Sequence, residues 1–418
     1  MNTLISASAL TCCALFLCLF PPDTEDWGFF GHRLINKKAV FTLPRDMIPF
    51  FKHHIDYLSA HAVDPDKRRY ATRHEAVRHY IDLDQWGEYP FEHVPRNRTD
   101  ALARHTMVQL INGADTLALI DSTLPFRMTD TIFIFHSNLC PDTLRLDFQT
   151  FRKFFINHFL HQYYEDEWTT PADSFPGLQE FCRIDTTHGS MVVAEDAFSP
   201  HGILPYHLMH MQKRLTEAFR QKDQDAILRL AADFGHYIGD AHVPLHTTSN
   251  YNGQLTNQLG IHAFWESRLP ELFAEESYDF FVGRANYIED PQSWYWTMVL
   301  ESHLLVDSAL AIEKRLSTTF PAEQQFCYDE RLGRVVRTQC RDYATAYHQA
   351  LNGQVERRMR EAVHAVGSAW YTAWVDAGQP VLHPTEMPPG NARINQADDQ
   401  TPELEDAAKS RTSRNHEQ

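Results

Sequence analysis

One short run, residues 235–246 (GHYIGDAHVPLH), holds the residue types best suited to binding a metal ion. His236 and Asp240 are four residues apart, so on a helix both side chains lie on one face. Pro244 would end that helix, and His246 would follow on the segment that leaves it. Imidazole and carboxylate are common zinc ligands. Three such groups within eleven residues therefore predict a metal site.

A second pair with the same spacing follows in GIHAFWESRLPE, where His262 and Glu266 are four residues apart. Such a pair alone is also common as a hydrogen-bonded pair on a helix surface. Its position sixteen residues after His246 strengthens the metal interpretation. Two helices that each carry such a pair can face each other and enclose several metal ions.

The N-terminal part of the chain adds further candidates. The run WGFFGHRLIN contains Trp27 and His32, and the run DPDKRRYATRHEAVRHYIDLD contains Asp66 and His79. In isolation Asp66, His79 and the other acidic residues of the second run would be interpreted as solvated charges on a loop and a helix. Asp64 is an alternative to Asp66 as a ligand.

Together these residues resemble the zinc-dependent phospholipase C and single-strand-specific zinc nuclease superfamily. The family pattern is an N-terminal Trp with a His five residues later, an Asp and a His about fourteen apart, HxxxD with a further His, and HxxxD or HxxxE. The resemblance covers about residues 27–271, with a large insertion between His79 and His236. Nine positions match in order: Trp27, His32, Asp66, His79, His236, Asp240, His246, His262 and Glu266.

The resemblance implies three zinc ions. The first would be bound by Asp66, His79, His236 and Asp240. The second would be bound by Asp240, His32, and the α-amine and carbonyl of Trp27. The third, more exposed ion would be bound by His246, His262 and Glu266. Asp240 would bridge the first two ions.

The resemblance also implies the reaction, which is hydrolysis of a phosphodiester by a metal-activated water that attacks phosphorus. Asp66, Arg69 and Asp240 are the expected catalytic residues. In the nuclease branch an Arg three residues after the Asp contacts phosphate, which favours Asp66 over Asp64. The alternative for Arg69 is a solvated basic run with its neighbours.

The choice of substrate depends on details of the motifs. Glu266, in place of Asp, resembles the phospholipase branch, and TTSNYNGQLTNQ replaces a Gly-Gly-Asn segment of the nuclease branch. Phe30 stands where choline-selective phospholipases carry Glu, so phosphatidylcholine is not implied. We expect a phospholipase C type enzyme. The alternatives are a nuclease or nucleotidase on the same site, and a zinc-binding protein without turnover.

Apolar residues recur at helical spacing along most of the chain. The fold class we expect is all-α, as a multi-helix domain with a helical insertion at about 95–200 and one short β-like patch at 131–135. The clearest helical segments are 101–120, 146–164, 208–220, 225–238, 294–316 and 342–374. The formal charge of −17 argues against a broad basic surface for polyanions, so metal ions would supply local positive charge. We expect a monomer.

The two ends of the chain differ from the rest. Residues 1–26 contain an uncharged apolar run typical of a signal peptide, which predicts a secreted or periplasmic protein. The family resemblance implies that Trp27 is the mature N-terminus. No later segment is long and apolar enough to span a membrane. Residues 27–383 would form the hydrolase domain, and 384–418 a disordered tail. Cys327 and Cys340 could form a disulfide or remain free thiols.

Overall fold

The computed structural model describes residues 29–69, 72–113, 115–120, 132–135, 144–165, 167–181, 189–331 and 334–384. The expected leader, Trp27, and the tail from residue 385 lie outside these residues. The described part is mostly helical, as the periodicity predicts. None of its helices combines the length and the apolar character that crossing a membrane requires.

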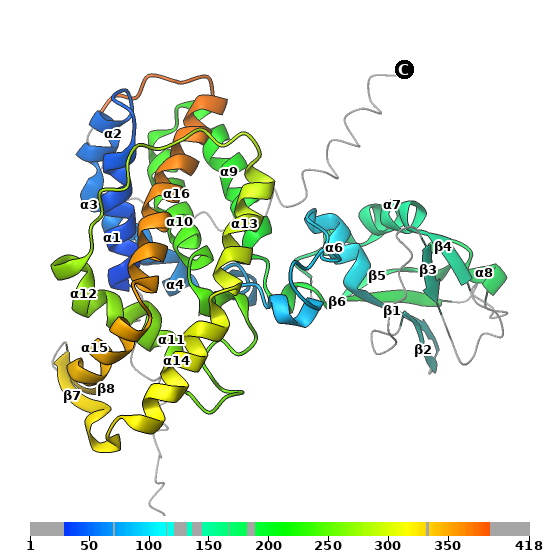
Figure 1. Ribbon diagram of the computed structural model, residues 1–418. Helices are drawn as coiled ribbons and strands as arrows, with labels where there is room; N and C mark the ends of the chain where they lie inside the picture. The colour runs from blue at the N-terminus through cyan, green and yellow to red at the C-terminus, as the bar shows by residue number, and fades with distance from the viewer. Residues whose placement is uncertain are drawn as a thin grey trace, which may run out of the picture.

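A helical body forms the larger part of the molecule (Figure 1), and α10 (Gln224–Ala241) lies at its centre, packed against α1, α9 and α16. The other helices of the body are α1 (Phe29–Ala39), α2 (Ile48–His53), α3 (Ile55–Ala60), α4 (Asp64–Arg68), α5 (Arg73–Ala76), α9 (Leu204–Gln221), α11 (Ile261–Ala263), α12 (Leu269–Ser277), α13 (Pro291–His303), α14 (Val306–Thr319), α15 (Arg341–Ala350) and α16 (Gln354–Asp376).

The central helix α10 begins and ends where its sequence requires. The side chain of Asp223 caps it by accepting a hydrogen bond from the backbone N–H of Ala226. The helix ends at Ala241, shortly before Pro244. Thirteen of its residues are buried, so this helix is surrounded by the body on most sides. One such contact is a hydrogen bond from the indole of Trp370 on α16 to the carbonyl of Ala231.

Two glycines allow α1 to lie unusually close to α10. A Cβ at Gly235 would lie 1.8 Å from Oδ1 of Asn36, and a Cβ at Gly239 would lie 2.8 Å from Nδ1 of His32. Asn36 uses this proximity to donate a hydrogen bond across the interface to the carbonyl of Ala232. The glycines in GHYIG therefore bring the helix that carries His32 against the helix that carries His236 and Asp240.

The insertion corrects the expectation of an all-α fold, because it contains β-sheet. Strands β1 (Thr106–Asn112), β2 (Asp115–Ile120), β5 (Trp168–Pro171) and β6 (Met191–Asp196) form an antiparallel sheet in the order β2-β1-β6-β5. Strands β3 (Ile132–Phe135) and β4 (Leu144–Asp147) form a second, two-stranded sheet. The helices of this region are α6 (Arg98–His105), α7 (Phe148–His158) and α8 (Leu178–Phe181). Figure 1 shows this region beside the helical body.

The predicted helix at 101–120 is wrong beyond His105, where β1 begins. Burial alternates along most of β1, which is the period of a strand. Asn112 at its end pairs with Asp115, and Gly113 begins the turn to β2. Gly113 has a φ of +62°, a conformation that suits glycine in such a turn. The patch at 131–135 is a strand over the described residues 132–135.

The chain leaves the body for the insertion and returns at nearly the same place. The backbone N–H of Ile203 donates to the carbonyl of Val77 at 2.8 Å, and that of Leu204 donates to the carbonyl of Tyr80 at 3.1 Å. The N–H of Asp82 donates to the carbonyl of His201 at 2.7 Å. These hydrogen bonds join the two ends of the insertion next to His79.

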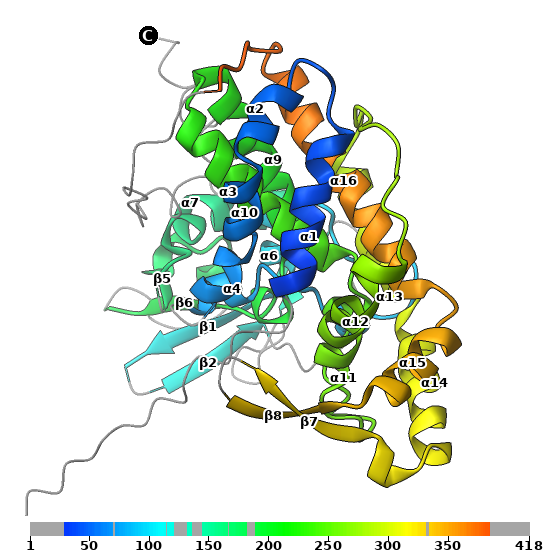
Figure 2. The same cartoon turned by 90° about the vertical axis from the view of Figure 1, so that its left-hand side faces the viewer.

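A disulfide links Cys327 and Cys340, which is one of the two alternatives left open by the sequence. It crosses the hairpin of β7 (Phe326–Arg331) and β8 (Arg334–Gln339). The hairpin contacts the body through Arg268, whose Nη2 lies 3.0 Å from Oδ2 of Asp329. Figure 2 shows the hairpin at the end of the body that also carries α11.

Candidate metal centre

Eight of the nine expected ligands lie in the described part of the chain, and the fold brings all eight together. Three groups of donor atoms, each within 4.8 Å of one another, are His32–His236–Asp240, Asp66–His79–His236 and His246–His262–Glu266. They come from α1, α4, the turn after α5, α10, η7 (Pro244–Thr247), α11 and the π-helical turn η8 (Phe264–Arg268). Residues far apart in the sequence therefore form one buried cluster that can hold metal ions.

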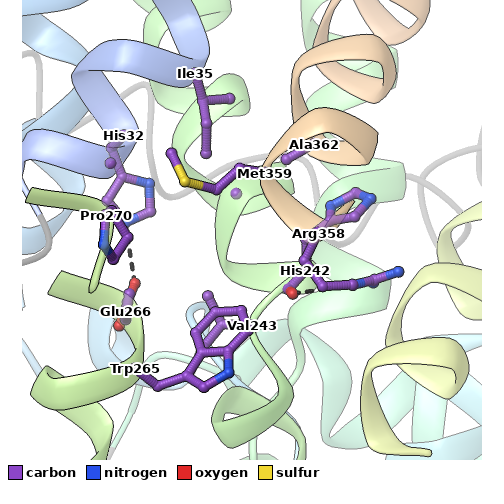
Figure 3. Close-up of a pocket in the computed structure, with 12 residues that line it drawn as sticks. His32, Ile35, His242, Val243, Trp265, Glu266, Pro270, Arg358, Met359 and Ala362 are labelled. Atoms are coloured by element: carbon purple, nitrogen blue, oxygen red, sulfur yellow. Dashed lines mark hydrogen bonds and ion pairs between the residues drawn. The ribbon is translucent and has the colours of Figure 1, made fainter. Parts of the chain in front are cut away.

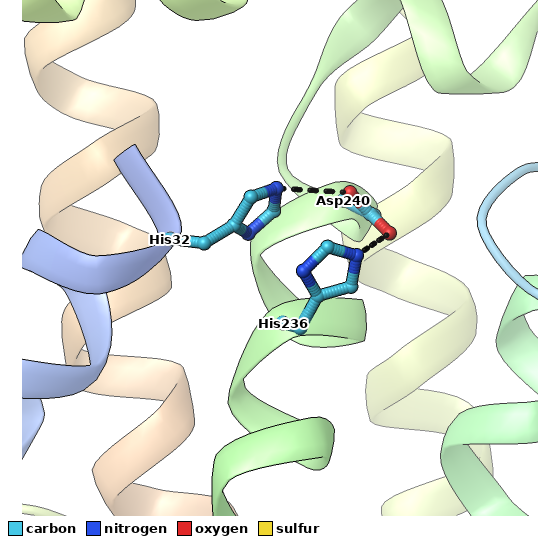
Figure 4. A group of neighbouring side chains, drawn as sticks. All are labelled: His32, His236 and Asp240. Carbon is cyan, nitrogen blue, oxygen red and sulfur yellow. Dashed lines mark ion pairs between the residues drawn. The ribbon is translucent and has the colours of Figure 1, made fainter. Parts of the chain in front are cut away.

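Asp240 contacts four histidines of this cluster, and Figure 4 shows its two oxygens facing His32 and His236. Its Oδ2 lies 3.0 Å from Nδ1 of His79 and 3.3 Å from Nε2 of His236. Its Oδ1 lies 3.5 Å from Nε2 of His32 and 3.8 Å from Nδ1 of His246. The two oxygens therefore face different groups of histidines, as a carboxylate that bridges two metal ions would.

Glu266 connects the remaining donors. Its Oε2 lies 2.7 Å from Nε2 of His262 and 3.3 Å from Nε2 of His246, and its Oε1 lies 3.4 Å from Nε2 of His32. Glu266 lies within the π-helical turn η8, and such turns are frequent at functional sites. The spacing of His262 and Glu266 therefore places both at one donor group, as the sequence predicts.

Backbone carbonyls orient two of the histidines. Nδ1 of His236 lies 2.8 Å from the carbonyl oxygen of Ala62, and Nδ1 of His246 lies 2.5 Å from that of His79. A carbonyl can only accept a hydrogen bond, so each Nδ1 carries a proton. In the neutral ring the Nε2 lone pair then faces the carboxylates, as in histidines that bind metals.

The electrostatics of the cluster require positive charge. Burial lowers the pKa of His236, but the carboxylates of Asp240 and Asp66 outweigh burial and raise this pKa to about 9. Burial likewise lowers the pKa of His246, while Asp240 and Glu266 raise it to about 9. Burial would raise the pKa of Asp240, but His236 and His246 hold that pKa well below its ordinary value.

This charge balance fits divalent cations. The carboxylates of Asp66 and Asp240 both contact His236, and that of Glu266 contacts the neighbouring His246. Burying carboxylates this close together costs free energy unless positive charge compensates them. The raised pKa values of His236 and His246 mean that protons on these two rings can supply such charge. Divalent ions at the three donor groups would replace those protons, and the mixed imidazole and carboxylate donors suit zinc.

The structure distinguishes Asp66 from its alternative. Asp66 is buried, and its Oδ1 lies 3.7 Å from Nδ1 of His79 and 3.6 Å from Nε2 of His236. Asp64 instead pairs with His61 and Lys67 outside the cluster. Arg69 is partly exposed, with Nη1 3.8 Å from Oδ1 of Asp66, so its guanidinium lies at the edge of the donor cluster.

Glu75 is a residue of this region that the sequence analysis missed. It is fully buried, and its Oε1 lies 3.7 Å from Nε2 of His79, the ring nitrogen not directed at Asp240. Its carboxylate also accepts hydrogen bonds from Tyr237 and Arg78. Burial would raise its pKa, but His79, Arg78 and Arg68 hold that pKa well below its ordinary value. The i,i+4 spacing of Glu75 and His79 was the available signal.

Beside His32 lies a small cavity between α1, α10 and α16 (Figure 3). His242 and Arg358 line the side away from Glu266. Burial and the nearby Arg358 charge lower the pKa of His242 to about 3, so this histidine is neutral. Its Nδ1 bonds the carbonyl of Ile238, and it belongs to none of the three donor groups.

Comparison with known proteins does not assign the chain to a family. No family model matches it, and no curated protein is significantly similar to it in sequence. The site must therefore be interpreted from its own geometry and from the resemblance in its motifs.

Proposed function

We propose that this chain is a zinc-dependent phosphodiester hydrolase of the phospholipase C type, binding three zinc ions. The observation that carries the proposal is the position of Asp240, whose two oxygens face His236 and His79 on one side and His32 on the other. A shared carboxylate between two donor groups is what closely spaced catalytic metal ions need. The order and spacing of the ligands in the sequence support the same family.

The assignment of the ligands follows the three donor groups. Asp66, His79, His236 and Asp240 would hold the first ion. His32 and Asp240 would hold the second, completed by Trp27, which lies outside the described residues. His246, His262 and Glu266 would hold the third. This third group has three protein donors and includes the partly exposed His262, so it suits an ion with a position open to substrate.

When bound, the metal ions would lower the pKa of water and neutralise charge on the phosphoryl group. The residues of the chain would hold the metal ions and the phosphoryl group in place. Asp240 and Glu266 hold the donor groups together, and the carbonyls of Ala62 and His79 fix two of the rings. Arg69, whose Nη1 lies 3.8 Å from Oδ1 of Asp66, would donate hydrogen bonds to a phosphate oxygen, which a guanidinium does well.

A lipid substrate is favoured over a nucleic acid. The chain has a formal charge of −17, which opposes binding of a long polyanion by its surface. Glu266 in the last motif also resembles the phospholipase branch. We propose accordingly that the enzyme cleaves phospholipids, and that it is exported and acts as a monomer.

The test combines a metal count with two assays. Purified protein is analysed for bound metal, and its N-terminus is sequenced to establish whether it begins at Trp27. Hydrolysis of a labelled phospholipid and of single-stranded DNA is then measured after chelation and after zinc is restored. We expect about three zinc ions and zinc-dependent cleavage of the lipid.

Other outcomes would contradict the proposal in distinct ways. Cleavage of DNA alone would assign the same centre to a nuclease. Fewer than two bound zinc ions together with no cleavage of either substrate would indicate a metal-binding protein without turnover.

A further inference from the structure

The segment between the donor residues His246 and His262 buries polar side chains and exposes apolar ones, the reverse of the usual arrangement. Residues 248–260 (TSNYNGQLTNQLG) connect η7, which carries His246, to α11, which carries His262. Two of its amide side chains, those of Asn250 and Gln258, are buried, whereas those of Gln254 and Asn257 are exposed. Asn250 is buried, donates to Oγ1 of Thr256 at 3.1 Å and accepts from the backbone N–H of Leu255 at 2.8 Å. Polar side chains therefore form the interior of this loop.

Further hydrogen bonds fix the loop to itself and to α14. The buried Gln258 donates through Nε2 to the carbonyl of Leu310 at 2.9 Å. Nζ of Lys314 donates to the carbonyl of Thr256 at 2.7 Å. The backbone N–H of Gly260 donates to Oδ1 of Asn252 at 3.0 Å. A loop held by these hydrogen bonds is already ordered. Binding of another surface to it therefore costs little conformational entropy.

The apolar side chains of the same loop face outward. Leu255 is 72% exposed, Leu259 is 71% exposed and Tyr251 is 52% exposed. A single exposed apolar residue is ordinary on a protein surface, but here a rigid loop presents three. Residues 248–260 contain no charged side chain, although the whole chain carries a formal charge of −17.

The loop lies next to the donor cluster but contributes none of its donor atoms. It begins just after His246 and ends just before His262, and the ring of Tyr251 lies edge-on to that of His262 with 6.0 Å between centroids. A surface that binds to this loop therefore lies next to the donor group of His246, His262 and Glu266.

We propose that residues 248–260 dock the enzyme on a zwitterionic lipid bilayer, with Leu255 and Leu259 inserted at the boundary between headgroups and acyl chains. The inference rests on the proposed function for the choice of lipid as substrate. Insertion of aliphatic side chains needs no opposite charge on the membrane, whereas the acidic protein is repelled by anionic lipid. A lipid phosphate at this boundary would lie beside His246 and His262.

A protein partner fits the same surface less well. A stable protein interface covers about 800 Å² on each side and involves about twenty residues. Three apolar side chains on one loop are too few for that, but they are sufficient for shallow insertion into a bilayer, where tyrosine is also favoured.

The experiment measures co-sedimentation of the zinc-loaded full-length protein with phosphatidylcholine vesicles. The test variant is Leu255→Ser with Leu259→Ser. Its matched controls are Leu255→Met with Leu259→Met, which keeps the apolar volume, and Val381→Ser, which changes a side chain that is 71% exposed elsewhere. Figure 2 shows the segment after α16, which holds Val381, at the opposite end of the body from α11.

We expect the double serine variant to bind vesicles at least about tenfold more weakly than the unchanged protein, because two leucine side chains are no longer buried in the apolar phase. Both controls should bind like the unchanged protein, and raising the salt concentration should have little effect. Equal binding by the serine variant, absence of binding by the unchanged protein, or binding only to anionic vesicles at low salt would overturn the proposal.

A second measurement separates this inference from the proposed function. Hydrolysis of a soluble diester, bis(p-nitrophenyl) phosphate, does not require a membrane and should be equal in the serine variant and the unchanged protein. Hydrolysis without loop-dependent vesicle binding would overturn the docking surface alone. Loop-dependent binding without any hydrolysis would support the docking surface and count against the proposed function.

Discussion

Glu75 lies 3.7 Å from the Nε2 atom of His79, while Nδ1 of the same ring lies 3.0 Å from Asp240. The histidine is therefore held between a carboxylate in the donor cluster and a carboxylate behind it. A carboxylate behind a metal-binding imidazole fixes the ring and increases its basicity. We infer from this contact that Glu75 positions His79, as part of a buried network with Tyr237 and Arg78.

Replacing Glu75 with Gln should weaken metal binding. The amide keeps the shape of the side chain but removes the charge that orients His79, and we expect about a 10- to 100-fold loss of zinc affinity. The measurement is a competitive titration with a chelator of known affinity. Thermal unfolding reports separately on the loss of the ion pair with Arg78. The exposed Glu217→Gln serves as control, and equal affinities in both variants would remove Glu75 from this role.

Asp240→Asn should release more than one metal ion, because its two oxygens face separate donor groups. Phosphodiesterase activity should fall at least about a hundredfold if metal activation supplies most of the rate. Metal content by elemental analysis and activity are measured on the same sample. The control is Asp225→Asn, an exposed acid in the first turn of the same helix. Full activity with unchanged metal content would refute the bridging role.

Gly239→Ala should displace His32, because the added Cβ would lie 2.8 Å from its Nδ1. We expect zinc affinity at the group that includes His32 to fall about tenfold, while the helical content measured by circular dichroism stays the same. Gly31→Ala is the matched control, since its Cβ would make only an ordinary contact of 3.8 Å. Identical zinc titrations for the two variants would show that this close approach does not position His32.

His105 makes the stability of the protein depend on pH. Its ring packs against Trp86 and Phe198, and burial, with the charges of Arg104 and His201, lowers its pKa from 6.5 to about 4. The folded state thus keeps His105 neutral while the unfolded state binds a proton. The stability that this neutral ring contributes is fully present above pH 6.5 and is lost as the pH falls from 6.5 toward 4.

His105→Phe should therefore protect the protein at low pH. Relative to the variant, the unchanged protein should lose about 2 kcal/mol between pH 7 and pH 5. Denaturant unfolding at both pH values measures this difference. Replacing the exposed His161 with Phe should have no such effect, and a pH-independent difference between His105→Phe and the unchanged protein would contradict the assignment.

The donor cluster was predictable because its residues follow helical spacing in short runs. His236 and Asp240 lie on one face of α10, and the break at Pro244 places His246 at the same cluster. The choice of Asp66 needed the structure, since both Asp64 and Asp66 lie in α4 and only their surroundings differ. Glu75 was hidden because its role depends on Arg78 and Tyr237, which reach it through the fold.

The fold of the insertion was less predictable. The apolar residues of 101–120 are compatible with both a helix and a strand, and only the pairing with β6, about eighty residues later, decides between them. Asn112 and Gly113 were a local signal for the hairpin that the helical interpretation overrode. Two predicted long helices are each divided, at Leu304–Leu305 and around Leu351–Gly353, where short turns redirect the chain.

The hydrogen bonds that join Val77 to Ile203 and Tyr80 to Leu204 determine how much change the insertion can tolerate. They make the two ends of the insertion neighbours, so a chain of any length can be accommodated between them without moving His79 or His236. Each doubling of such a loop adds only about 0.6 kcal/mol of closure entropy. This region is therefore structurally separable from the donor cluster, and its length and internal fold can change while the cluster keeps its geometry.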